Sequence, residues 1–105
     1  MTNDTFICHL PEFRWQRLQN VGQIPSNRAA HAAVAVEHMY FVFGGALGGG
    51  GPSDDNLYEL NLFQTTNEAP WKIRNCLGTS PGVRYGHLMA FLKPFLIVHG
   101  GNTGN

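Results

Sequence analysis

The chain has 105 residues and a mass of 11.6 kDa, which is enough for one small domain. Seven basic residues balance seven acidic residues, and this neutral charge argues against a nucleic-acid-binding surface. No apolar run approaches the roughly 18 residues of a membrane-spanning helix, and the first residues lack the pattern of a signal peptide. We therefore expect a protein of the cytoplasm or the nucleus, with no nucleic acid and no membrane among its partners.

Thirteen glycines and six prolines favour short strands and turns, so the sequence predicts an all-β fold. Residues 1–12 are expected to form an N-terminal extension before the first strand. The predicted strands then cover residues 13–18, 29–37, 39–43, 56–62, 71–76, 85–92 and 95–99. The alanine-rich run 29–37 lacks alternation, which is typical of a strand that is buried on both faces. Residues 56–62 alternate, which predicts that Tyr58 and Leu60 share one face of a strand.

A repeat with an offset of 56 residues organises the chain. A tryptophan, an arginine, a histidine and a pair of glycines each recur at this spacing without a gap, which chance would rarely produce. The paired positions are Trp15 and Trp71, Arg28 and Arg84, His31 and His87, Gly44 and Gly100, and Gly45 and Gly101. We interpret these residues, together with Tyr58, as a structural repeat motif, and we find no catalytic set among them.

The repeat unit resembles the kelch family of β-propellers, whose blades are antiparallel four-stranded sheets. The residues that carry the resemblance are Arg28-Ala-Ala-His31, Tyr40-Phe-Val-Phe-Gly44-Gly45, the segment 56–62 and Trp71. The resemblance implies an incomplete propeller over residues 13–105. Residues 13–24 would supply the outer strand of a preceding blade, 25–76 one full blade, and 81–101 the inner half of the next blade. Because propellers have roughly four to eight blades, we expect exposed apolar faces and self-association of this chain.

The glycine-rich stretch 48–51 is a candidate for a ligand site. A phosphate-binding loop needs a following Lys and a helix whose N-terminus faces the anion, but a strand is predicted after this stretch. Asp54 and Asp55 come next, and adjacent carboxylates in a loop usually point apart into solvent. We therefore expect a flexible connection here, with no cofactor and no metal bound to this chain.

The repeated polar and aromatic residues are expected to have structural roles. Each repeated histidine should hydrogen-bond buried backbone, because buried polar groups normally find partners. Each repeated arginine should bind a loop carbonyl, and both tryptophans should pack between adjacent blades. In kelch proteins that grip peptides, positions between the motif arginine and histidine contribute to binding. Those positions are Ala29-Ala30 and Tyr85-Gly86, so Tyr85 is the candidate partner-binding residue.

Three segments resemble a narrower group, the serine/threonine protein phosphatases with kelch-like domains, which act in plant brassinosteroid signalling and occur in apicomplexan parasites. They are Arg28-Ala-Ala-His31-Ala-Ala, Asp54-Asp-Asn-Leu-Tyr58 and Pro81-Gly-Val-Arg84-Tyr-Gly-His87-Leu-Met89. The resemblance implies a polypeptide in which the propeller precedes a phosphatase domain with two metal ions, expected to be manganese. The motifs G-D-x-H-G, G-D-x-x-D-R-G and G-N-H-E of that domain are absent here, so this chain alone is not expected to hydrolyse phosphate esters.

The sequence thus predicts a protein-interaction and regulatory module whose partner is a phosphoprotein or the linked phosphatase domain. The kelch module of a ubiquitin-ligase substrate adaptor or of an actin-binding scaffold is the alternative. Those proteins usually carry a helical dimerising domain before the repeats, and residues 1–12 are too short for one.

Overall fold

The computed structural model describes residues 1–49 and 51–104, and it is all-β apart from one 3-10 turn. Its strands are β1 (Thr5–His9), β2 (Arg14–Gly22), β3 (Ala32–Val36), β4 (Met39–Phe43), β5 (Leu57–Asn61), β6 (Glu68–Arg74), β7 (Leu88–Leu92) and β8 (Phe95–His99). The turn η1 (Leu62–Gln64) follows β5. Within the described ranges no helix is long and apolar enough to cross a membrane. The predicted all-β class is confirmed.

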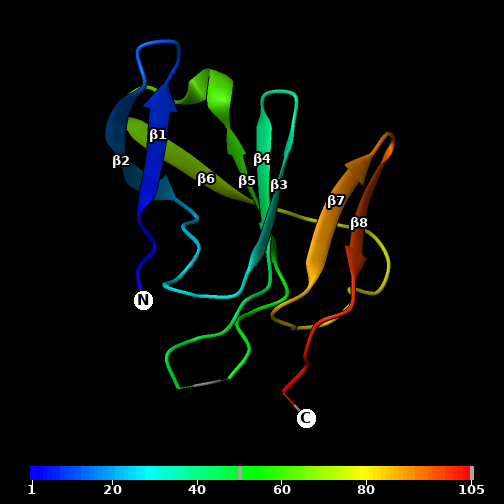
Figure 1. The fold of residues 1–105 in the computed structure, drawn as a ribbon. Coiled ribbons are helices and arrows are strands. Elements are labelled where there is room, and N and C mark those ends of the chain that lie inside the picture. The colour runs from blue at the N-terminus through cyan, green and yellow to red at the C-terminus, as the bar shows by residue number, and fades with distance from the viewer. Residues whose placement is uncertain (50, 105) are drawn as a thin grey trace.

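Strands β3, β4, β5 and β6 form one antiparallel sheet, which is the complete blade (Figure 1). The end of β2 pairs in parallel with β6 and joins the β1–β2 hairpin to the outer side of this sheet. Strands β7 and β8 form a separate two-stranded sheet on the other side of the blade. The chain therefore contains one full blade and parts of two neighbours, as the predicted incomplete propeller requires.

The core lies between the complete blade and the β1–β2 hairpin. Alternation along β5 directs Tyr58 and Leu60 into it, and Leu18 from β2 packs there as well. Trp71 on β6 joins the same cluster, and its indole Nε1 donates a hydrogen bond to Asn20 Oδ1 on β2 at 2.9 Å. A buried indole N–H needs such an acceptor, so this hydrogen bond fixes how β2 meets the complete blade.

The structure adds one strand that the sequence analysis did not predict. Strand β1 lies inside the stretch 1–12, which we expected to precede the first strand. It pairs with β2 in a register that puts Cys8 opposite Trp15. In the complete blade Leu60 lies opposite Trp71, so β1 corresponds to β5 and β2 corresponds to β6. The preceding blade is therefore represented by its two outer strands rather than by one.

Two predictions about burial were wrong. Strand β3 is half-buried rather than buried on both faces, because it is an edge strand of its sheet. Trp15 is 71% exposed, whereas Trp71 is 6% exposed, although both occupy the same repeat position. The reason lies in their neighbours, because in the described part of the chain no inner strands stand beside β1 and β2 to cover the Trp15 ring.

Candidate interaction surface

The two motif segments 28–31 and 84–87 meet where the complete blade adjoins the β7–β8 hairpin, and we call this place the motif rim. The Gly45 N–H donates to the Arg84 carbonyl at 2.8 Å, and the Gly86 N–H donates to the Ala30 carbonyl at 2.8 Å. Ala30 and Gly86 stand at the same repeat position, and both have a positive φ, of 56° and 68°. The backbone conformation therefore repeats along with the side chains.

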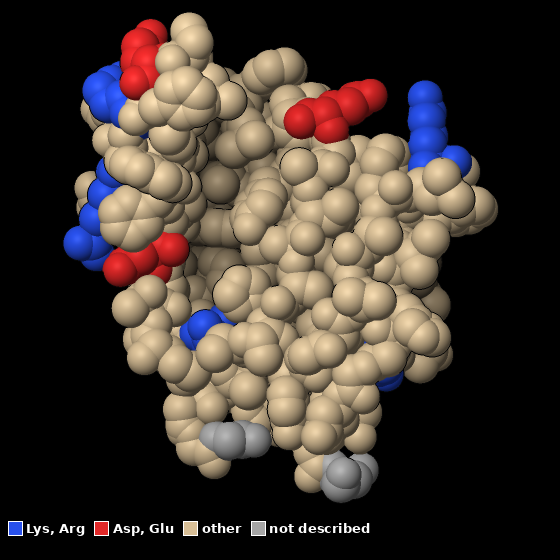
Figure 2. All heavy atoms as spheres, in the orientation of Figure 1, with Lys and Arg blue, Asp and Glu red and all other residues tan. Residues whose placement is uncertain are grey.

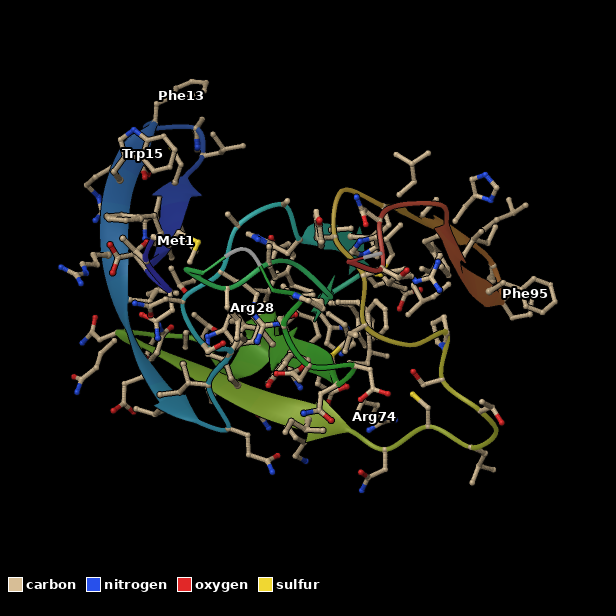
Figure 3. The ribbon with its side chains drawn as sticks, turned by 90° about the horizontal axis from the view of Figure 1, so that it is seen from below. Met1, Phe13, Trp15, Arg28, Arg74 and Phe95 are labelled. Atoms are coloured by element: carbon tan, nitrogen blue, oxygen red, sulfur yellow. The ribbon has the colours of Figure 1, made fainter. Side chains whose placement is uncertain are left out.

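Arg28 is a buried cation at the motif rim, and it lies near the centre of the view in Figure 3. Its Nη1 donates to the Gly44 carbonyl at 3.1 Å and to Ser53 Oγ at 3.3 Å. Its Nη2 donates to Ser26 Oγ and to Asp54 Oδ2, both at 3.1 Å. A buried guanidinium is tolerated when its charge is paired and its donors are used. Arg28 therefore ties a loop carbonyl, as expected, but it also anchors a larger polar cluster.

The structure corrects the expectation that Asp54 is simply solvated. Asp54 accepts hydrogen bonds from the Tyr58 hydroxyl at 2.8 Å and from the Asn56 backbone N–H at 3.0 Å, besides its ion pair with Arg28. Partial burial acts to raise the pKa of Asp54, but these hydrogen bonds and the Arg28 charge outweigh it and hold the pKa below its usual value. The Arg28 guanidinium also lies 5.1 Å from the centroid of the Tyr58 ring, within cation–π range. Asp55 is exposed.

We expect Asp54→Asn to destabilise the chain at neutral pH and to have little effect in acid. The folded-state pKa is depressed, so the carboxylate stabilises fully above its unfolded value of about 3.9 and loses this effect as the pH falls through the folded value. Urea titrations at pH 7 should show that the free energy of unfolding falls by about 1–2 kcal/mol. The loss is modest because the Asp54 side chain is 36% exposed and water screens part of the interaction. Asp55→Asn is the control. An equal loss at pH 7 and pH 3 would contradict the ion pair.

Arg84 repeats only part of the Arg28 arrangement. Its Nη1 donates to the Gly100 carbonyl at 3.0 Å, as Arg28 does to Gly44, and its Nη2 donates to the Pro81 carbonyl. Among the described residues its Nε is buried without a hydrogen-bond partner, and no carboxylate forms an ion pair with it. Within the described residues, Arg84 thus preserves the loop-carbonyl contact without an acidic partner.

The two repeated histidines have different environments. His87 is 6% exposed and meets the Phe43 ring edge-on at a centroid distance of 5.8 Å, whereas His31 is exposed. Burial lowers the pKa of His87, with the Phe43 carbonyl opposing and the Arg84 charge adding to this shift. Partial desolvation and the Arg28 charge lower the pKa of His31. The Phe43 carbonyl is the buried backbone group that acts on the His87 ring, but its geometry falls short of a full hydrogen bond, and neither ring nitrogen has another partner within the described residues.

Tyr85, the candidate partner-binding residue, is half-buried at the motif rim. Its N–H donates to the Asn102 carbonyl at 3.0 Å and its carbonyl accepts from the Asn102 N–H at 2.8 Å. The same backbone bridge joins Ala29 to Ala46 in the first repeat. Because backbone atoms hold both bridges, the side chain at this position is not needed for the local fold. Whether Tyr85 binds a partner stays a prediction.

The glycine-rich stretch connects β4 to β5, and Gly50 within it lies outside the described residues. The Leu47 N–H donates to the Gly51 carbonyl at 2.8 Å, and a strand rather than a helix follows. A helix N-terminus for a phosphate is therefore not found in the described part of this connection. Across residues 1–49 and 51–104, no three His, Cys, Asp or Glu side chains come together, and Cys8 and Cys76 are free thiols. The expectation of no bound metal stays a prediction.

The blade topology and the repeated rim define a segment of a kelch-type propeller, and comparison with known proteins agrees. Residues 1–105 match the family model described as the KLHDC2/KLHL20/DRC7 Kelch-repeats domain, so the chain belongs to the kelch-repeat family. It is 40% identical over 93 residues to the serine/threonine-protein phosphatase BSL2 of Arabidopsis thaliana, covering 87% of this chain and 9% of that protein.

The names of two further relatives do not describe phosphatases. The chain is 31% identical over 101 residues to tip elongation aberrant protein 1 of Schizosaccharomyces pombe, covering 94% of this chain and 8% of that protein. It is 33% identical over 97 residues to the Rab9 effector protein with kelch motifs of Mus musculus, covering 90% of this chain and 25% of that protein. The chain spans a quarter or less of the length of these three relatives.

Proposed function

We propose that the chain is a protein-interaction module that positions or regulates a serine/threonine phosphatase domain in the same polypeptide. The observation that carries this proposal is the 40% identity to a serine/threonine-protein phosphatase across 87% of the chain. The segments 28–33 and 81–89, which resemble that group in sequence, also contain the residues that join the two blades at the motif rim. The metal ions, expected to be manganese, would belong to the linked domain, and the protein would act in the cytoplasm or the nucleus.

The chemistry of the motif rim favours the linked domain over a phosphoprotein as the partner. The Arg28 guanidinium uses its Nε, Nη1 and Nη2 for bonds inside the chain, so it is not available to a phosphate. Figure 2 shows that charged side chains are sparse on the face of the complete blade and lie mainly at its margins. Recognition would therefore rest on shape and on aromatic contact by Tyr85.

The test is the complete reading frame that encodes this chain, followed by a binding measurement. We expect the frame to continue into G-D-x-H-G, G-D-x-x-D-R-G and G-N-H-E, in that order. The phosphatase domain, produced separately, should bind the kelch chain in isothermal titration calorimetry. A reading frame without these motifs would overturn the proposal.

Tyr85→Ala should weaken binding to the phosphatase domain by about tenfold, because an interfacial tyrosine commonly contributes more than about 1 kcal/mol. Tyr85→Phe retains the ring and should bind nearly as well as the parent chain. The melting temperature of both variants should match the parent, since the Tyr85 backbone makes the local contacts. If the Tyr85→Ala variant bound the phosphatase domain with unchanged affinity, Tyr85 would not be part of the binding surface.

A second candidate is a kelch interaction module that has no phosphatase domain. The 33% identity to the Rab9 effector protein with kelch motifs supports it. Under this candidate the reading frame encodes further kelch repeats and none of the phosphatase motifs. The adaptor and actin-scaffold alternatives differ from it by a helical dimerising domain encoded upstream of the repeats.

A further inference from the structure

Ser80 is an exposed serine in the connection between β6 and β7, and it precedes a proline. The chain has three serines and six threonines, and of these only Ser80 is followed directly by proline. A proline disfavours the helical conformation of the residue before it, so the backbone at Ser80 favours an extended form. Residues 75–81 are all exposed, and Figures 1 and 3 show their connection, in yellow, as a loop at the margin of the molecule. An enzyme that modifies side chains can therefore reach the Ser80 hydroxyl.

The neighbouring blades leave this position open. Ser80 is exposed although the blade before its connection, the complete blade, is present. Its equivalent at the repeat offset of 56 is Ile24, which lies in the connection between β2 and β3. The blade after that connection is the complete blade, and Ile24 is still 37% exposed. Neither the preceding nor the following blade covers this repeat position, so Ser80 stays accessible in a polypeptide that continues beyond residue 105.

The turn formed by residues 80–82 brings the Ser80 hydroxyl close to Arg84. The Gly82 backbone N–H donates a hydrogen bond to Ser80 Oγ at 2.9 Å. The carbonyl of Pro81, in the same turn, accepts a hydrogen bond from Arg84 Nη2. The hydroxyl and the guanidinium thus contact the same three residues. A phosphate on Ser80 Oγ would extend from this turn within reach of the Arg84 side chain.

The first repeat shows what the turn side of this guanidinium binds when an acceptor is present. Arg28 Nε donates to the Ser26 carbonyl at 3.2 Å, and its Nη2 donates to the Ser26 hydroxyl at 3.1 Å. Gly82 stands at the position of Ser26 and has no hydroxyl. Among the described residues Arg84 Nε is buried without a hydrogen-bond partner, and the turn that faces it lies inside the described chain. Because an unsatisfied buried donor is costly, an acceptor brought by Ser80 would be stabilising.

The charge and shape of a phosphate fit this turn. A phosphoserine carries about two negative charges at neutral pH and three strong acceptor oxygens. The guanidinium of an arginine binds phosphate oxygens through parallel N–H donors, in a geometry that a lysine does not offer. No Asp or Glu occurs between Arg74 and Arg84, so the connection itself carries no like charge against a phosphate.

We propose that Ser80 is a phosphorylation site for a proline-directed serine/threonine kinase and that Arg84 binds the resulting phosphate. In the reaction Ser80 Oγ bonds to the γ-phosphorus of ATP as the bond from that phosphorus to the bridging oxygen of ADP breaks. ADP leaves, and the hydroxyl proton passes to the catalytic base of the kinase. The phosphate then ties the connection between β6 and β7 to the motif rim. The inference is independent of the proposed function, because both tests below use this chain without a phosphatase domain.

Phosphorylation of the purified chain tests the acceptor residue. The folded chain, with its strands verified by far-UV circular dichroism, is incubated with ATP, Mg²⁺ and a proline-directed serine/threonine kinase. Intact mass should increase by one phosphoryl group, and tandem mass spectrometry should locate that group on Ser80. Ser80→Ala should abolish the reaction, whereas the matched control Thr79→Val should leave it unchanged. An unmodified chain, or a phosphate on any residue other than Ser80, would overturn the proposal.

The pKa of the phosphate tests the role of Arg84. Phosphorus nuclear magnetic resonance of the chain phosphorylated on Ser80 should show that the second phosphate pKa falls from its ordinary value of about 6 to about 5, because the nearby guanidinium favours the dianion. The same chain unfolded in urea should return to about 6.

Arg84→Gln should raise this pKa back to its ordinary value in the folded chain, and Arg84→Lys should restore part of the difference. Arg74→Gln is the matched control, because it removes a basic residue from the other end of the connection and should leave the phosphate pKa low. Circular dichroism shows whether each variant is folded. Equal phosphate pKa values in the parent chain and in folded Arg84→Gln would overturn the assignment of Arg84 as the phosphate ligand.

Discussion

Replacing Gly44 by Ala should lower the free energy of unfolding by about 3–4 kcal/mol. Gly44 has a φ of +75°, a conformation that an alanine adopts only with strain. A Cβ atom at this position would lie 2.4 Å from the His87 ring and 2.5 Å from the Arg84 carbonyl oxygen. Both contacts belong to the second repeat, so the substitution forces the two blades apart. Urea unfolding followed by tryptophan fluorescence measures the loss.

Gly86→Ala is the matched control for this prediction. Gly86 has a φ of +68°, but a Cβ atom there would meet nothing within 4 Å. The strain alone should therefore cost about 1 kcal/mol, and Ala30 already occupies the equivalent position in the first repeat. Equal losses for Gly44→Ala and Gly86→Ala would show that the close approach between the blades does not exist in solution.

Arg28→Leu is the second substitution with a large expected effect, a loss of about 3 kcal/mol in the free energy of unfolding. It removes the donors to the Gly44 carbonyl and to the side chains of Ser26, Ser53 and Asp54. Asp54 keeps its hydrogen bonds from Tyr58 and Asn56. The buried Gly44 carbonyl and the Ser53 hydroxyl lose their donor, however, and an unsatisfied buried polar group costs more than the hydrogen bond itself stabilises.

Arg84→Leu is the repeat-equivalent control and should lose about 1 kcal/mol, because Arg84 binds two carbonyl oxygens and no carboxylate among the described residues. The double variant Arg28→Leu/Asp54→Asn should lose less than the sum of its single variants, since both remove the same ion pair. Additive losses, or equal losses for Arg28→Leu and Arg84→Leu, would contradict the buried cluster.

The repeat in the sequence predicted the strands well where both copies carry the pattern. The boundaries of β4 and β8 are as expected, and Tyr58 and Leu60 share the buried face that alternation on β5 predicts. Strand β1 was missed because the connection from β1 to β2 covers residues 10–13, whereas that from β5 to β6 covers residues 62–67. An ungapped offset of 56 therefore aligns Trp15 on β2 with Trp71 on β6 but cannot align β1 with β5.

The environments of the repeated residues were harder to predict than their identities. Trp15 and Trp71 share a motif position, but burial depends on which strands stand beside them. Trp71 lies on β6, which β2 covers by pairing with it, whereas no further strand of the described chain covers Trp15 on β2. His31 and His87 differ for the same reason, since Phe43 covers His87 alone. A repeat reports the local conformation, whereas packing depends on elements outside the repeat unit.

The Asp54 ion pair had no signal in the local sequence. Its partner Arg28 lies 26 residues earlier, and adjacent acidic residues in a loop are usually solvated. Within the described residues only Arg28 forms an ion pair with an acidic residue of a later loop. The second repeat therefore offers no matching pair from which the Arg28–Asp54 contact could be predicted. The contact could be recognised once the fold placed the loop after β4 against the start of β3.

Two hydrogen bonds test most directly whether consecutive kelch repeats are joined through the backbone of the motif rim. They run from the Gly45 N–H to the Arg84 carbonyl and from the Gly86 N–H to the Ala30 carbonyl, both at 2.8 Å. Nuclear magnetic resonance can detect scalar couplings across such bonds between the donor nitrogen and the acceptor carbonyl carbon. We predict both couplings, with slow exchange of both amide protons. Absent couplings and exchange at the rate of a fully solvated amide would contradict the joined blades.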